Sequence, residues 1–326
     1  MDNQLIYGKD QTARVVSIEP RGTSLNVFIQ DEMGGVRCEE RHHFGWALAA
    51  QPYGGGWEQL DGQNHFKFMK KYPTHQRMRM DMSKTRDMWC VWDAKEAALI
   101  THGITHFKGM NLSDVSVLAF DIEATTLEHG PDAKVLLISN TFRKNGFTER
   151  RLFAFDDYED PADFFNAWVE WVRERDPSVV CGHHIFGYDL PYLEYCARMA
   201  GVELRLGRDG SPLHLNDWPS RFRRDGSQEY EFHNAFIYGR EIVDTFFLSF
   251  KYDVGRKYVS YGLKQIIEQE GLEVPGRQFY DAAKIRDNYK DPVEWVKIKA
   301  YAEHDADDAL ASVSYTHLTL PTNREV

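Results

Sequence analysis

Hydrophobic residues from Val115 to Phe120 form a nearly unbroken run in the middle of the chain. A run of this length predicts one β-strand that is buried on both faces. The strand ends in Asp121 and Glu123, where the pattern would otherwise continue with Val or Ile. Because residues two apart on a strand project from the same face, both carboxylates are expected to point at one spot.

Further apolar runs predict strands, and stretches with helical spacing predict helices. The helix after Asp160 is supported by this N-cap acid, by Pro161 at the first helical position and by aromatic residues at helical spacing. The last helix begins in the same way, at Asp291 and Pro292. In order, we expect strands at Val135–Ser139, Arg151–Phe155, Val179–Gly182 and Glu241–Phe250, and helices from Pro161 to Asp176, from about Pro191 to Gly201, from Tyr258 to Glu270, and from Pro292 to about Ala311.

Residues 1 to about 105 are expected to form a separate, smaller β-rich domain. Alternating apolar and polar positions at Ala13–Ile18 and Leu25–Ile29 predict short strands. Gly-rich breaks at Gly34-Gly35 and Gly54-Gly55-Gly56 predict turns between such strands.

Two basic segments are candidates for contact with nucleic acid. The segment Lys67–Arg86 holds seven basic residues, among them Lys70 and Lys71, against one acid, with Phe, Tyr and Met between them. Such a run could pair phosphates and stack bases, or it could be an ordinary solvated surface. Residues 204–240 are rich in turn signals and predict a hairpin that carries Arg223 in a second basic patch.

Composition narrows the class of protein. With 326 residues and 42% hydrophobic residues, the chain can bury a substantial core and is expected to hold two domains. The four cysteines form no Cys-x-x-Cys pair, so neither a zinc site nor a disulfide framework is indicated. No apolar run is long enough for a membrane span and no signal peptide is evident, which predicts a soluble, cytoplasmic protein. A net charge of −11 argues against nucleic-acid binding through the overall field, although not through bound metals and a local basic patch.

The carboxylates of the central strand are accompanied downstream by further candidates. Two like charges side by side are unfavourable unless one is protonated or a cation lies between them, so a divalent metal is the simplest explanation. Asp189 falls at a loop-to-helix junction, and Tyr301 and Asp305 are four apart on the last predicted helix, where they would share a face. Asp308 lies on nearly the same stripe as Asp305, and Asp244 is a further candidate carboxylate for which a structural role is favoured.

In this order and spacing, three segments resemble the exonuclease motifs of the tyrosine branch of the DEDD superfamily. They are FDIEATT from Phe120, GHHIFGYDLPYL from Gly182 and YAEHDADDAL from Tyr301. Residues 106–311 are similar to the 3′-5′ proofreading domain of family B DNA polymerases of the phage and archaeal type, and the preceding segment resembles their N-terminal domain. The resemblance implies a ribonuclease-H-like mixed sheet flanked by helices. One departure is His184, at a position where the family usually has Asn; it still offers a polar contact to substrate.

The resemblance also implies the roles of individual residues. Hard oxygen ligands without a His or Cys cluster favour two ions of Mg²⁺ or Mn²⁺. By resemblance, Asp121, Glu123 and Asp305 hold one ion, Asp121 and Asp189 hold the other, and Tyr301 orients the attacking water. The implied function is removal of mismatched 3′ nucleotides from single-stranded DNA at a primer-template. This exonuclease activity would act together with a polymerase domain of the same polypeptide. No polymerase motif occurs in this chain.

Alternatives to this interpretation are a stand-alone 3′-5′ exonuclease of the same superfamily and a catalytically silent module that binds DNA or a replication partner. The expected protein is a monomer without membrane association, with a sliding clamp or other replisome proteins as candidate partners. If a phage encodes it, its compartment is the cytoplasm of the infected bacterium. The stretch VSYTHLTLPTNREV from Val313 has no helical or core pattern and resembles a translated sequencing adapter, so residues 312–326 are expected to be a non-native tail.

Overall fold

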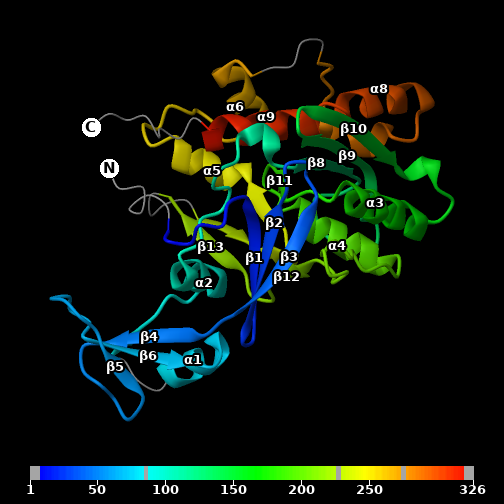
Figure 1. Cartoon of the computed structure of the whole chain (residues 1–326). Coiled ribbons are helices and arrows are strands. Elements are labelled where there is room, and N and C mark those ends of the chain that lie inside the picture. Colours follow the sequence, from blue (N-terminus) through cyan, green and yellow to red (C-terminus); the bar gives the residue numbers. More distant parts are fainter. Residues whose placement is uncertain (1–7, 84–86, 225–228, 273–276, 319–326) are drawn as a thin grey trace. The chain divides into compact units, whose positions relative to one another are not determined.

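The computed structural model describes residues 8–83, 87–224, 229–272 and 277–318, with side chains described as far as Ser314. The chain divides into two compact units, Met1–Asn111 and Leu112–Val326 (Figure 1). Each unit is built around its own β-structure, and each has a separate apolar core.

The first unit contains two antiparallel sheets, as its alternating pattern predicts. One sheet has the order β1-β2-β3, and the other has the order β5-β6-β4-β7. Helix α2 packs on the first sheet through Ala98, and α1 covers the second through Met78 and Met82. The bounds are β1 Val15–Arg21, β2 Ser24–Gln30, β3 Val36–His42, β4 Gly45–Ala49, β5 Trp57–Gln59, β6 Phe68–Tyr72, α1 His75–Met82, β7 Met88–Trp89 and α2 Ala94–His102.

The second unit is organised around a five-stranded mixed sheet with the order β10-β9-β8-β11-β16. The predicted central strand is β8, which pairs antiparallel with β9 and parallel with β11. Strand β10 continues the antiparallel side, and β16 continues the parallel side. The bounds are β8 Val117–Ala124, β9 Val135–Lys144, β10 Phe147–Ala154, β11 Val179–Gly182 and β16 Glu241–Asp244.

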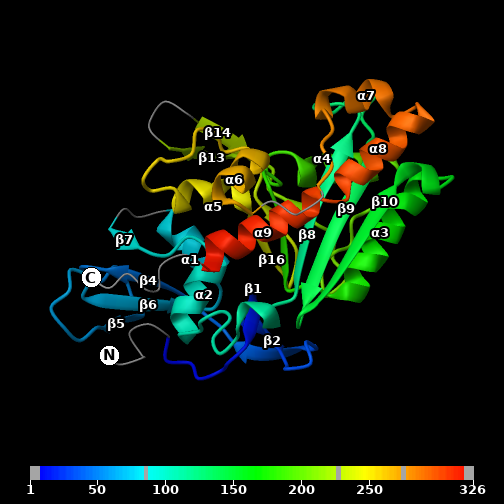
Figure 2. The ribbon, with the colours of Figure 1, turned by 90° about the horizontal axis from the view of Figure 1, so that it is seen from above.

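Helices cover both faces of this sheet, which gives the ribonuclease-H-like α/β arrangement (Figure 2). On one face, Leu118, Phe120 and Ile122 of β8 pack in a core with the aromatic stripe of α3 and with α4. On the other face, α8 packs against Leu136 and Leu137 of β9, and α9 crosses β8. The odd-numbered Asp121 and Glu123 therefore belong to the face that α8 and α9 cover.

The remaining elements of the second unit are short. As the turn-rich pattern predicts, β13 and β14 form an antiparallel hairpin, and β12 pairs with β15. The bounds are η2 Leu112–Asp114, η3 Phe155–Asp157, α3 Pro161–Arg175, α4 Asp189–Met199, β12 His214–Leu215, β13 Ser220–Arg223, β14 Glu229–Phe232, β15 Ala235–Phe236, α5 Thr245–Tyr252, α6 Leu263–Glu270, η4 Ala282–Lys284, α7 Ile285–Asn288, α8 Pro292–Ala302 and α9 Asp305–Leu318.

One predicted strand is wrong over most of its length. The stretch Glu241–Phe250 is a strand only as far as Asp244, and the aromatic residues after it form α5. The Asp244 carboxylate caps this helix by accepting from the Phe246 N–H at 3.0 Å. An apolar run of this length cannot distinguish a strand from a buried helix, and the cap determines the outcome.

The last predicted helix is also corrected. It is interrupted at Glu303 and His304, so Tyr301 lies in the last turn of α8 while Asp305 begins α9. The chain after Val313 continues this second helix to Leu318, although its sequence shows no helical pattern. Val313 is buried, and Ser314 donates to the Leu310 carbonyl at 2.7 Å, as a helical serine does. The rest of the expected non-native tail, residues 319–326, lies outside the described residues.

Smaller boundary errors have local causes. Helix α4 begins at Asp189, two residues before Pro191, and α6 begins at Leu263, five residues after Tyr258. The segment before α6 is held by the Asp253 carboxylate, which accepts from the Lys257 and Tyr258 N–H groups. These hydrogen bonds offer the backbone an alternative to a helix.

Candidate active site

Three predicted carboxylates converge on one face of the central sheet. Asp121 and Glu123 project from β8, and Asp305 reaches them from the first turn of α9. One oxygen from each of the three carboxylates lies within 4.8 Å of the others. The alternation of β8 explains the arrangement, because its even-numbered apolar neighbours are anchored in the opposite core.

Asp189 lies beside the backbone of the same strand, β8. It is the first residue of α4, is 3% exposed, and its Oδ1 accepts from the Ile122 N–H at 3.2 Å. The chain reaches α4 through Gly182, where a Cβ would lie 2.7 Å from the Phe120 carbonyl oxygen. Only glycine allows this close approach of β11 to β8, which positions Asp189 between Asp121 and Glu123 along the strand.

Burial and mutual repulsion make these four carboxyls reluctant to ionise together. Burial raises the pKa of Asp121 well above its usual range, and the charges of Asp189, Asp305 and Glu123 raise it further. Burial and the Asp305 charge raise the pKa of Glu123 to about 8. Burial likewise raises the pKa of Asp189, to about 7, and that of Asp305. A divalent cation bound among these carboxylate oxygens would compensate their negative charges and stabilise the ionised forms.

Tyr301 borders the cluster from the end of α8. It is 2% exposed, and burial together with the nearby carboxylates raises the pKa of its phenol, which therefore stays protonated. The Lys264 ammonium of α6 donates to the Tyr301 hydroxyl and lies 4.2 Å from the centre of its ring. The positive charge of Lys264 also lowers the pKa values of Asp121, Glu123 and Asp305 against the effect of burial.

A buried arginine contacts both acids of α9 that are candidates for the third motif. Arg277, only 4% exposed, pairs with both Asp305 and Asp308. Asp308 has no exposed surface and does not belong to the three-carboxylate group. The geometry thus groups Asp305, rather than Asp308, with the carboxylates of β8.

Sequence reasoning missed Lys264 and Arg277. Lys264 lies on an amphipathic helix with nothing in its neighbourhood to distinguish it from other surface lysines. Arg277 lies in a connection between α6 and η4 that carries no periodic pattern. Their placement depends on long-range packing, which single-sequence patterns do not record.

The loop between β11 and α4 holds His184 in an uncommon conformation. Its φ of 65° is in the left-handed region, and the Asp244 carboxylate accepts from the backbone N–H groups of His184 and Phe186 at 2.8 and 3.0 Å. Asp244 thus fixes this loop and caps α5, as expected for a structural acid. Gly187 leaves room for the His184 ring, since a Cβ there would lie 2.5 Å from the ring nitrogen Nε2. Burial lowers the pKa of His184, so its imidazole is neutral at pH 7.

The basic residues that are candidates for contact with nucleic acid each lie beside an acidic side chain. Lys71 Nζ lies 3.0 Å from Glu58, and Lys70 Nζ lies 3.7 Å from Asp81. Arg223 pairs with Glu229 across the hairpin.

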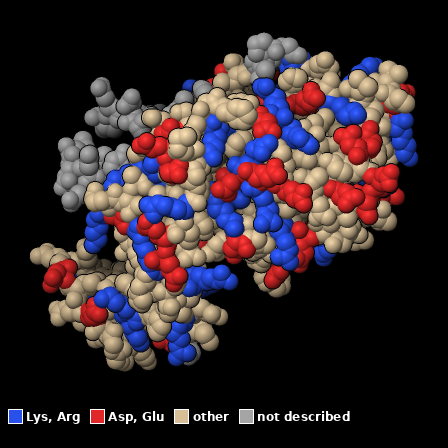
Figure 3. Space-filling model, turned by 45° about the vertical axis from the view of Figure 1, so that its right-hand side comes forward, with Lys and Arg blue, Asp and Glu red and all other residues tan. Residues whose placement is uncertain are grey.

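The surface and the cysteines add little to the candidate chemistry. Basic and acidic side chains are interspersed over much of the visible face rather than gathered by sign (Figure 3). Three cysteines are buried, Cys38 is exposed, and all four are free. None of the helices among the described residues combines the length and apolar character that crossing a membrane requires.

The strand order, the strand directions and the acidic group at the central strand define a nuclease-type domain of the ribonuclease-H-like fold. A family model described as "DNA polymerase family B, exonuclease domain" matches residues 63–266, which is more than half of the chain. The chain therefore belongs to the exonuclease-domain family of family B DNA polymerases, as the sequence motifs predict.

The curated relatives include DNA polymerases of archaea, a virus and a plant. A DNA polymerase of Pyrococcus glycovorans is 29% identical over 119 residues, covering 35% of this chain and 15% of the relative. DNA polymerase 2 of Aeropyrum pernix is 32% identical over 97 residues, covering 30% and 12%. The DNA polymerase delta catalytic subunit of Arabidopsis thaliana is 31% identical over 134 residues, covering 35% and 12%.

A solved structure shares the fold over most of the chain. The family B DNA polymerase of Pyrobaculum calidifontis matches with a TM-score of 0.66 and 17% identity. The match covers 91% of this chain and 44% of that polymerase. The chain thus spans less than half of the solved polymerase, with the mixed sheet and the N-terminal antiparallel sheets included.

Proposed function

We propose that this chain is a 3′-5′ exonuclease that removes terminal nucleotides from single-stranded DNA with the help of two divalent metal ions, Mg²⁺ or Mn²⁺. The observation that carries the proposal is the convergence of Asp121, Glu123 and Asp305 within 4.8 Å. Membership in the family supports the reaction class, and the carboxylate geometry supports the choice of residues. Asp189 completes the set from the start of α4.

The donor set suits hard cations. Four carboxylates without His or Cys ligands favour Mg²⁺ or Mn²⁺ over zinc or copper. Asp121, Glu123 and Asp305 would hold one ion, and Asp121 and Asp189 the other. When bound, a pair of such ions lowers the pKa of a water and neutralises charge that develops on the phosphate and on the leaving oxygen.

The chain's own residues would orient the reactants. The protonated Tyr301 hydroxyl can donate toward the attacking water or the scissile phosphate, and Lys264 restrains it through the ring and the hydroxyl. His184 lies in the loop that leads to Asp189, and it can offer a neutral imidazole to the substrate strand. In the reaction, the water oxygen forms a bond to phosphorus, the bond between phosphorus and the 3′ oxygen breaks, and this oxygen leaves as an alcohol after it takes a proton. The released product is a nucleoside 5′-monophosphate.

The longer relatives suggest the setting of this activity. We propose that the domain proofreads in cis with a polymerase domain, acting on the primer 3′ end, with residues 1–105 as N-terminal domain and 106–311 as exonuclease domain. We also propose that the protein is a monomer and that a replisome protein such as a sliding clamp is its partner. Contacts of Lys70, Lys71 and Arg223 with the DNA strand, and a location in the cytoplasm of a host bacterium, are further proposals. The non-native origin of residues 312–326 also stays a prediction.

The test is digestion of a 5′-labelled single strand by the chain, with Mg²⁺ and with chelator. We expect a ladder that shortens from the 3′ end, requires metal and is absent in Asp121→Asn and Asp305→Asn. Asp157→Asn is the matched control, because it removes the same charge from an exposed position in η3. Asp308→Asn should retain cleavage, because Asp308 lies outside the three-carboxylate group.

Other outcomes separate the alternatives. Undiminished cleavage by Asp305→Asn, with loss in Asp308→Asn, would move the third motif to Asp308. A folded chain that binds DNA and never cuts it under any metal condition would contradict the nuclease proposal for this chain and favour a silent binding module.

A further inference from the structure

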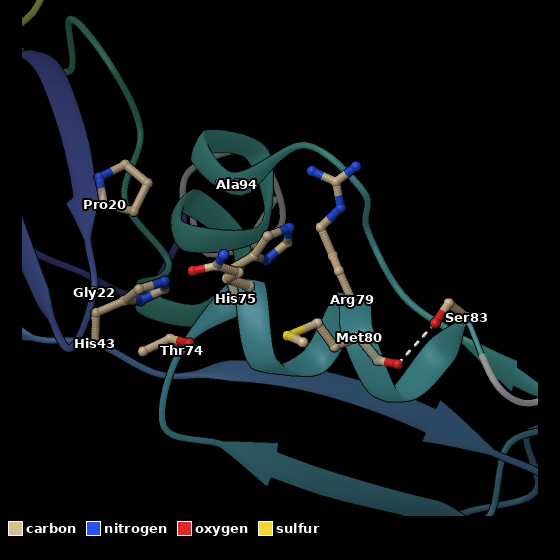
Figure 4. Close-up of a pocket in the computed structure, with 10 residues that line it drawn as sticks. Pro20, Gly22, His43, Thr74, His75, Arg79, Met80, Ser83 and Ala94 are labelled. Carbon is tan, nitrogen blue, oxygen red and sulfur yellow. Dashed lines mark hydrogen bonds between the residues drawn. The ribbon is translucent and has the colours of Figure 1, made fainter.

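The first unit contains a pocket that the proposed nuclease function does not use. It has a volume of about 530 Å³ and lies between the β1–β2 turn, α1 and the start of α2 (Figure 4). Pockets for small molecules typically measure about 300–1,000 Å³. Among the described residues that line it there is no Asp or Glu, although the chain has 50 acidic residues, whereas Arg79 and two histidines are present.

His43 brings a buried polar atom to this pocket. The residue is 1% exposed, its Nδ1 lies 3.2 Å from His102 Nε2, and its Nε2 is buried without a hydrogen-bond partner among the described residues. Its ring points toward Thr74 and His75 at the beginning of α1 (Figure 4). Burial and the neighbouring histidines lower the pKa of His43 to about 4, so it is neutral at pH 7. If His102 donates to Nδ1, Nε2 carries a hydrogen that is directed at the pocket.

The beginning of α1 adds a positive potential. Thr74 is a neutral N-cap that accepts from the Arg77 N–H, and the first turn contains no acid. At α2, by contrast, Asp93 is the cap and Glu96 lies in the first turn. The partial positive charge of the α1 N-terminus is thus left without a compensating carboxylate.

His75 and Arg79 lie four apart on α1 and rise on the same side of the helix toward α2 (Figure 4). The Arg79 guanidinium lies 5.5 Å from the ring centre of Trp92 and makes no salt bridge within the described part of the chain. His75 Nε2 lies 3.0 Å from the Trp92 carbonyl, so it must be the donor there. His75 Nδ1, the other ring nitrogen, is buried without a hydrogen-bond partner among the described residues.

We propose that this pocket binds a phosphate monoester, either free or at the end of a nucleic-acid strand. Arg79, the α1 N-terminus and His43 Nε2 supply donors and positive charge for the phosphate oxygens. A monoester carries close to two negative charges at pH 7, because its second pKa is about 6, whereas a phosphodiester carries one. The donors and positive charge gathered in the pocket therefore favour the monoester. The proposal is independent of the nuclease site.

The experiment is titration calorimetry of the whole chain in chelator, with AMP, inorganic phosphate and 3′,5′-cyclic AMP as probes. Arg79→Gln is compared with Arg77→Gln, which removes the same charge from the same helix at a position that does not line the pocket. We expect saturable binding of AMP and phosphate, weakened about tenfold or more by Arg79→Gln and less than about twofold by Arg77→Gln. Cyclic AMP, a diester, should bind at least about tenfold more weakly than AMP.

Further measurements identify the source of the phosphate and keep the test decisive. An oligothymidylate with a 5′ phosphate, compared with its 5′-hydroxyl form, shows the same Arg79 dependence if a strand end is the ligand and none if a free nucleotide is. A histidine ¹⁵N spectrum should show AMP shifting the His43 and His75 ring signals, and Arg79→Lys, which keeps the charge, gives intermediate affinity. Equal effects of the Arg77 and Arg79 variants, equal binding of cyclic AMP, or no binding of any probe below about 10 mM would overturn the proposal.

Discussion

Replacing Glu123 by Gln should stabilise the metal-free protein while weakening its response to metal. In the absence of a cation, burial and the neighbouring Asp305 charge raise the pKa of Glu123 from 4.5 to about 8. An acid whose pKa is raised in the folded state costs stability as pH rises from its unfolded pKa to its folded pKa. The neutral amide removes that cost and keeps nearly the same shape.

The size of the effect follows from the pKa values. Each tenfold change in proton affinity corresponds to about 1.4 kcal/mol, so the full difference at pH 8 would be about 4 kcal/mol. Glu123 is partly exposed and shares the repulsion with its neighbours, which reduces the expected gain to about 2 kcal/mol. For a domain of this size, that gain corresponds to a rise of roughly 4–8 °C in Tm.

The assay is thermal unfolding at pH 8 in chelator and in Mg²⁺. Glu128→Gln serves as the control, because it removes one negative charge from an exposed loop next to β8. Wild type should gain stability with Mg²⁺, since a ligand that binds only the folded state stabilises it, and Glu123→Gln should gain less. A Tm in chelator at or below that of Glu128→Gln, or an undiminished Mg²⁺ response, would refute the reasoning.

Three further perturbations test other parts of the structure. Arg277→Gln should destabilise the protein by about 3–5 kcal/mol in urea unfolding, because it leaves Asp308 buried without its counter-charge; a loss below about 1 kcal/mol would contradict this. At limiting Mg²⁺, cleavage should rise between about pH 7 and 8 as Asp189 and Glu123 lose protons, and saturating Mg²⁺ should move the rise to lower pH, whereas a flat pH profile would count against these carboxyls as ligands. Trp168→Ala should cost about 3–5 kcal/mol in the same urea assay, since Trp168 is 1% exposed in the core, and a small loss would show that α3 is not essential to that core.

The sequence predicted those features that depend on local chemistry. The buried run before Asp121 became β8, and the Asp160 and Asp291 caps correctly marked the beginnings of α3 and α8. The aromatic run after Asp244 was misassigned because strand and buried helix share an apolar pattern, and only the cap separates them.

The parts of the site that could not be predicted depend on packing between distant segments. The sequence does not reveal the interruption between α8 and α9, because Glu303 and His304 are residue types that also occur inside helices. Lys264 and Arg277 become part of the site only when the folded chain brings them to Tyr301 and Asp305. Patterns along the chain indicate which face of a helix or strand a residue occupies. They do not indicate which positively charged side chain from a distant segment will contact it.

The hydrogen bond from the Ile122 N–H to Asp189 affects how inactive forms of this domain should be made. Strand β11 pairs with β8 only as far as Ala119, so beyond that point the Asp189 carboxylate takes the place of a neighbouring strand. Asp189→Ala would therefore remove a candidate ligand and release the edge of β8 in one step, and a loss of activity would have two causes. Asp189→Asn keeps an acceptor oxygen for Ile122, which makes the amide the cleaner choice for a variant that should lose only the candidate ligand.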